Sequence, residues 1–63
     1  MNLYDFIDEF SDRIDSIIIE EGGVIDYSRS KESLDEVRAH WILNNDRLNK
    51  LANYHDVNLK NNR

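Results

Sequence analysis

The chain has 63 residues, enough for one small domain and no second one. It has no cysteine, which excludes disulfides and thiolate metal sites, so a chain this short needs good helix packing or a partner chain. Its net charge of −5 is uneven, because residues 1–26 hold eight acidic side chains and one basic one, whereas residues 27–63 hold five acidic and seven basic ones. This balance argues against binding to nucleic acid or to an anionic membrane, since both need lysine and arginine.

The first third of the chain carries apolar residues at alternating spacings of four and three, which is typical of one helix face. These residues are Leu3, Ile7, Phe10, Ile14 and Ile17. Asn2 suits the N-cap, and Gly22-Gly23 suits the C-terminal end of a helix. The pattern predicts a helix over residues 3–21. The alternative is a β-hairpin over residues 16–27, because β-branched residues flank the two glycines.

A linker at residues 24–29 leads to a second predicted helix at residues 31–55. It starts near Ser30 or Ser33, and Ser33 and Glu36 fit a capping box there. Its apolar seam again alternates spacings of three and four, and it consists of Leu34, Val37, Trp41, Asn44, Leu48, Leu51 and His55. Residues Asn44 to Asp46 favour caps and turns, so a break there is the alternative to one continuous helix; Asn44 otherwise sits on the seam, where it could set the register.

Together these elements predict an all-α fold. We expect residues 1–57 to form an antiparallel helical hairpin, followed by a flexible polar tail at residues 58–63.

The outer face of the first helix is strongly acidic. It carries Asp5, Asp8, Glu9, Asp12 and Asp15. Arg13 is the only base on this helix, whereas a plain solvated helix usually mixes charges of both signs. The pattern indicates a surface that docks on a basic site of a larger protein, and the alternative is a solvated face that serves solubility alone.

The second helix holds more apolar residues than one hairpin interface covers. The predicted self-association face consists of Trp41, Ile42, Leu43, Leu48, Leu51 and Tyr54. Two hairpins meeting there would form a dimeric four-helix bundle. The alternative is that the linker, or a third helix after a break at Asn44, covers these side chains within one chain.

Catalytic and metal-binding motifs are missing from the sequence. There is no glycine-rich phosphate loop and no cysteine nucleophile. Glu36 and His40 are four residues apart, but two ligands do not make a metal site, and His55 lies far along the chain. We expect no enzymatic activity, no metal and no cofactor.

The order of helix, Glu-x-Gly turn and second helix resembles the small aspartyl-phosphate phosphatases that act on response regulators in spore-forming bacteria. The resemblance covers residues 6–43 and is mostly topological. The second helix of that family carries Ser-Gln-Glu-Leu-Asp, and the aligned residues 31–35 match it at Leu34 and Asp35. The resemblance implies a response-regulator phosphatase that depends on Asp35.

The leading hypothesis is therefore a small acidic regulatory or inhibitory protein that acts by protein–protein interaction, of a kind that phages and accessory elements encode. No apolar run is long enough for a membrane span and no secretory signal is evident, so we expect it in the cytoplasm, or in the host cytoplasm if the source is viral. The alternatives are a structural homo-oligomeric bundle without a charged-face partner and the phosphatase class.

Overall fold

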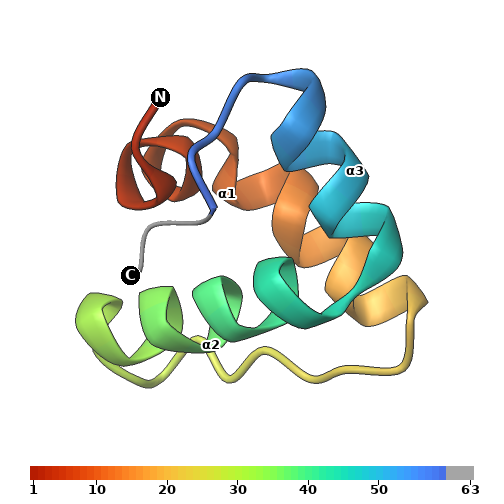
Figure 1. Ribbon diagram of the computed structural model, residues 1–63. Helices are drawn as coiled ribbons and strands as arrows, with labels where there is room; N and C mark the ends of the chain where they lie inside the picture. Colours follow the sequence, from red (N-terminus) through yellow and green to blue (C-terminus); the bar gives the residue numbers. More distant parts are fainter. Residues whose placement is uncertain (60–63) are drawn as a thin grey trace.

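The computed structural model describes residues 1–59 and contains three helices in that range. They are α1 (Leu3–Glu20), α2 (Lys31–Asn44) and α3 (Asp46–Tyr54), arranged around one core (Figure 1). The described residues contain no strand, so the all-α prediction is confirmed and the β-hairpin alternative at residues 16–27 is wrong. None of the described helices is long and apolar enough to cross a membrane.

Helix α1 begins and ends as its sequence predicts. The Asn2 side chain accepts a hydrogen bond from the Tyr4 amide at 2.7 Å. At the other end, the amides of Gly22 and Gly23 donate to the carbonyl oxygens of Ile19 and Ile18, which is the Schellman pattern. Gly22 has a φ of 97°, a left-handed conformation that glycine adopts without steric cost. The helix also kinks at Phe10.

Helix α2 starts one turn earlier than the predicted capping box. Ser30 is the N-cap, and its hydroxyl oxygen accepts a hydrogen bond from the Ser33 amide at 3.1 Å. The Ser33–Glu36 capping box is therefore wrong. Ser33 instead lies inside the first turn, where its amide is one of the free donors that the cap satisfies.

The second predicted helix is broken at Asn45. This residue has extended backbone angles and serves as C-cap of α2 and N-cap of α3, where its side chain accepts from the Leu48 amide at 3.2 Å. The continuous helix over residues 31–55 is wrong, and the alternative break at Asn44–Asp46 is confirmed. The break folds α3 back over the other helices, which brings Leu48 and Ala52 into the core.

Helices α1 and α2 run in the same direction, so the predicted antiparallel hairpin is wrong. In an antiparallel pair the sequence separation of contacting residues changes steadily along the helices. Here it stays constant: Asp8 contacts Lys31, Asp15 contacts Arg38, and Glu21 contacts Asn45, at separations of 23, 23 and 24 residues. Figure 1 shows both helices entering on one side of the molecule and ending on the other.

The linker at residues 21–30 makes this arrangement possible, because it crosses back along the helices (Figure 1). The return from Glu20 to the level of Asp8 is about 18 Å at the helical rise. Ten residues span up to about 33 Å when extended, so the linker has length to spare. Gly23 passes directly over Trp41, and Ile25 packs against the core.

Helix α3 runs antiparallel to α1. Arg47 at its start forms ion pairs with Glu20 and Glu21 at the end of α1. His55 at its end packs on Phe10, with ring centroids 4.5 Å apart. Beyond α3, the Met1 amino group donates to the Asp56 carbonyl oxygen, and the Asn58 amide donates to the Met1 carbonyl oxygen. The remainder of the predicted tail, residues 60–63, lies outside the described residues.

The three helices enclose an apolar core that all of them supply. Its fully buried large side chains are Phe6, Ile7, Ile14, Ile18, Ile42 and Leu48. Every apolar residue predicted for the inner face of α1 is buried or packed against the core. The buried face of α2 differs from the predicted seam, because it centres on Leu34, Asp35, Arg38 and Ile42. Asn44, which the pattern placed on the seam, is exposed.

Candidate functional site

A network of buried charges joins α1 to α2. Arg38 of α2 donates two hydrogen bonds to Asp15 of α1, from Nε to Oδ1 and from Nη2 to Oδ2, both at 2.7 Å. Its Nη1 donates to Asp35 Oδ1 at 3.0 Å. All three side chains are buried. A two-pronged arginine–carboxylate contact fixes distance and orientation together, so the network sets how the two helices pack.

The network continues to the surface through two further residues. The Tyr27 hydroxyl on the linker donates to Asp15 Oδ2 at 2.9 Å. Lys31 Nζ donates to Asp8 Oδ1 and to Asp35 Oδ2, both at 2.6 Å. No buried side-chain nitrogen or oxygen among the described residues is left without a hydrogen-bond partner. The charges are therefore compensated, which a buried ionic cluster needs in order not to unfold the protein.

The network favours the ionised forms of its members. Burial opposes the ionisation of Asp35, but the hydrogen bonds from Lys31 and Arg38 outweigh it and hold the pKa of Asp35 below its ordinary value. The hydrogen bonds to Asp15 raise the pKa of Arg38 further above its ordinary value. At neutral pH both charges are present, so the cluster acts as a fixed ionic link.

Four of the five predicted docking residues lie on the surface and one does not. Asp5, Asp8, Glu9 and Asp12 are exposed. Asp15 is only 4% exposed, so its placement on the outer face is wrong. The reason is the direction of α2, which lies against this side of α1 and brings Arg38 opposite Asp15.

The acids of α1 divide into neutralised and unneutralised groups. Asp8, Asp15 and Glu20 each form an ion pair with a base from α2 or α3. Asp5, Glu9 and Asp12 form no ion pair with another described residue. These three recur at spacings of four and three, so they share one edge of the helix. We call them the acidic edge of α1.

Most side chains of the predicted self-association face are buried or half-buried within the chain itself. Ile42 and Leu48 are fully buried, which contradicts their placement on an outer face. Trp41 and Leu51 are half-buried and pack against the core. Leu48 and Leu51 lie on α3, which packs against α1 and α2 within the same chain, as the third-helix alternative predicts. Only Leu43 and Tyr54 of the six remain exposed.

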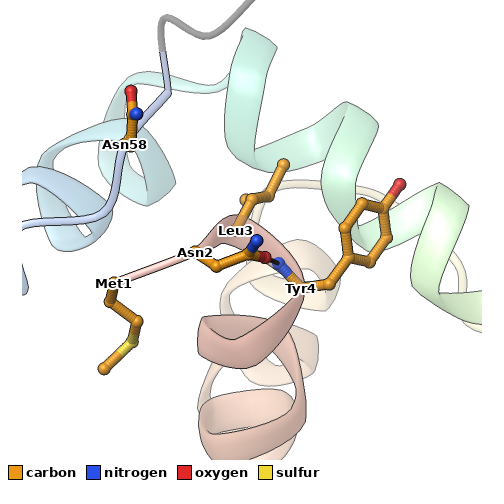
Figure 2. A pocket seen from close by; sticks show the side chains of 5 residues that line it. All are labelled: Met1, Asn2, Leu3, Tyr4 and Asn58. Atoms are coloured by element: carbon orange, nitrogen blue, oxygen red, sulfur yellow. Dashed lines mark hydrogen bonds between the residues drawn. The ribbon is translucent and has the colours of Figure 1, made fainter.

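No other part of the described chain offers a more developed site. A shallow depression lies beside Met1, Asn2, Leu3, Tyr4 and Asn58, and Figure 2 shows Asn2 turned toward the Tyr4 amide that it caps. None of these five side chains is charged. Residues 1–59 contain no group of three or more histidine, cysteine, aspartate or glutamate side chains that could hold a metal ion.

Arg38, Tyr27 and Lys31 are the members of the network that the helical pattern does not single out. A signal for two of them exists in the sequence: Asp8 and Asp15 are seven residues apart, and so are Lys31 and Arg38. Opposite charges at the same heptad spacing on two helices indicate that the helices pair through them, but the spacing fits a parallel and an antiparallel pair equally well. Nothing comparable in the sequence indicates Tyr27.

Asp35, which the resemblance to the phosphatases implies as functional, has both carboxylate oxygens bonded to cations of its own chain. Comparisons with protein-family models, with curated proteins and with solved structures found no match to this chain.

Proposed function

We propose that this chain is a small regulatory or inhibitory protein that acts by binding a larger protein, with the acidic edge of α1 docking on a basic surface. The observation that carries the proposal is the division of charge on α1. The fold supplies cations to Asp8, Asp15 and Glu20 but supplies none to Asp5, Glu9 and Asp12 from its described residues.

The acidic edge has a cost in stability that the fold does not recover. Within this edge, Asp5 and Glu9 are four residues apart, and like charges at this spacing destabilise a helix by roughly 0.2–0.5 kcal/mol. Solubility alone does not need this arrangement, because mixed charges serve it as well. A basic partner would supply the missing cations and remove the repulsion.

The proposal includes no catalytic step and no cofactor. Asp35 is buried and its two carboxylate oxygens accept hydrogen bonds from Lys31 and Arg38, so the proposal assigns Asp35 to holding α1 and α2 together. We place the protein in the cytoplasm, or in the host cytoplasm if a phage encodes it.

The test is affinity purification from host lysate with a tagged protein and two matched double variants. Asp5→Lys with Asp12→Lys changes the acidic edge. Asp46→Lys with Glu36→Lys makes the same charge change on α3 and α2, and Asp46, like Asp5, lies in the first turn of its helix. We expect the double variant of the acidic edge to capture no partner protein, and the control double variant to capture the same protein as the wild type. Equal capture by both would refute the docking surface.

Self-association is the second candidate, and the observation that favours it is the exposure of two large side chains on α2 and α3. Leu43 is half-exposed and Tyr54 is 83% exposed. A two-fold dimer that covered them would join the three described helices of each chain, six in all, instead of the four of the predicted bundle. Light scattering at micromolar concentration tests this directly. A dimer mass for the wild type and a monomer mass for the double variant Tyr54→Ser, Leu43→Ser would support self-association. A monomeric wild type would refute it.

A further inference from the structure

Exposed apolar side chains border the acidic surface of α1, and their positions indicate which kind of partner segment would fit it. Tyr4, Asp8, Asp12 and Ile19 follow one another at spacings of 4, 4 and 7, so they form one line along the helix. Asp15 lies on the same line between Asp12 and Ile19, but it is buried and bonded to Arg38, so it is not part of the exposed surface. We call this line the α1 stripe. Tyr4 and Ile19, at its two ends, are 50% and 53% exposed.

The linker adds a third apolar group beside the middle of the α1 stripe. Tyr27 is 63% exposed, although its hydroxyl is held by Asp15. The hydrogen bond at 2.9 Å from its hydroxyl to Asp15 Oδ2 holds the ring against α1 and raises the pKa of Tyr27. The surface thus consists of carboxylates with an aliphatic or aromatic side chain at each end and another at one side.

We propose that this surface binds a basic amphipathic helix, with lysine or arginine on the acids and apolar side chains on Tyr4, Tyr27 and Ile19. This rests on the proposed function and names the class of partner segment. Tyr4 and Ile19 are fifteen residues apart, which is about 22 Å along α1 and equals four turns of a partner helix.

The negative charge and the exposed apolar side chains together favour a basic amphipathic helix over a basic loop, a second copy of this chain or a membrane. A basic loop without apolar residues would leave the two tyrosines uncovered, although exposed tyrosines are frequent anchors of interfaces. A second copy of this chain docked by the same surface would set one acidic surface against another, because a two-fold contact uses the same patch on both copies. An anionic membrane is repelled by the same charges.

The experiment is an NMR titration of the ¹⁵N-labelled full chain at low salt with two synthetic peptides of about 16 residues. One is a leucine–lysine peptide with leucines at helical spacing, and the other has the same composition in a scrambled order that is not amphipathic. We expect the amphipathic peptide to shift the amides of Tyr4, Asp12, Ile19 and Tyr27, and to bind about tenfold more tightly than the scrambled one.

Matched variants locate the apolar contribution. We expect Ile19→Ser and Tyr4→Ser each to weaken binding of the amphipathic peptide about tenfold, and Tyr54→Ser, which removes an exposed aromatic ring elsewhere, to leave it within about twofold. The unbound spectra report whether each variant is folded. If a variant is not folded, the residues whose amides shift in the wild type show whether the peptide binds at the α1 stripe.

The outcomes separate this inference from the proposed function. Equal affinity for the two peptides, with loss of binding in Asp5→Lys, Asp12→Lys, overturns the amphipathic partner and leaves acidic docking in place. Binding that survives these two reversals contradicts both. Shifts confined to other surfaces, or no binding of the amphipathic peptide, overturn the inference.

Discussion

Two aspartates three residues apart on α1 have opposite surroundings. Asp15 faces Arg38 of α2 and is buried, whereas Asp12 faces solvent and has no ion-pair partner among the described residues. The residue type and its helix are the same, so the difference lies in what α2 places opposite each carboxylate. At the scale of single residues, the structure assigns Asp15 to holding the fold and leaves Asp12 exposed.

Removing Arg38 tests the structural half of this division. Arg38→Met leaves Asp15 and Asp35 buried without their shared cation, and we expect it to lower the free energy of unfolding by about 3–5 kcal/mol. Urea denaturation followed by circular dichroism measures this. Adding Asp15→Leu and Asp35→Leu to Arg38→Met should restore most of the loss, because an apolar cluster needs no cation; a triple variant as unstable as the single one would contradict the account.

Stability should also fall in acid, because Asp35 loses its charge. The pKa of Asp35 is held below its ordinary value of about 3.9 in the folded protein, so its contribution is present above about pH 4 and is lost as the pH falls through the folded value. We expect the free energy of unfolding, from urea curves between pH 6 and pH 2, to decrease in this window. Asp35→Asn should flatten the decrease, and an unchanged slope in that variant would argue against the role of Asp35.

At the scale of the elements, the success of sequence reasoning depends on what each helix buries. The range and inner face of α1 are predictable because every buried position except Asp15 is apolar. The inner face of α2 is not, because Asp35 and Arg38 are buried among its apolar residues and the hydrophobic spacing selects Val37 and Trp41 instead. The break at Asn45 is visible as an alternative, but choosing it requires the contacts of α3.

The linker requires a residue without a side chain at Gly23. A Cβ atom there would lie 2.5 Å from Trp41 Cζ2 and 2.6 Å from Ile18 Cγ2. We expect Gly23→Ala to cost about 1–3 kcal/mol of unfolding free energy in thermal or urea melts. In a Trp41→Phe background, which removes the crowded indole ring, the same substitution should cost less. Equal costs in both backgrounds would show that the close approach to Trp41 is not the cause.

At the scale of the whole molecule, the parallel arrangement of α1 and α2 decides which acids of α1 form ion pairs within the chain. An antiparallel hairpin, which the composition and the Gly-Gly end of α1 favour, would not bring Lys31 to Asp8 and Arg38 to Asp15. The crossover linker does so, and the apolar residues predicted for self-association go into the core of the same chain. Long-range register of this kind depends on pairs of charges rather than on periodicity, and single-helix patterns do not contain it.

The most direct test of the proposed docking is the affinity of the purified partner for three proteins, measured by calorimetry at low and at physiological salt. The proteins are the wild type, Asp5→Lys with Asp12→Lys, and the control Asp46→Lys with Glu36→Lys. The account predicts that the first pair binds at least about tenfold more weakly than the wild type, that the control stays within about threefold, and that salt weakens the wild-type complex. Equal affinity of both double variants, with no dependence on salt, would contradict it.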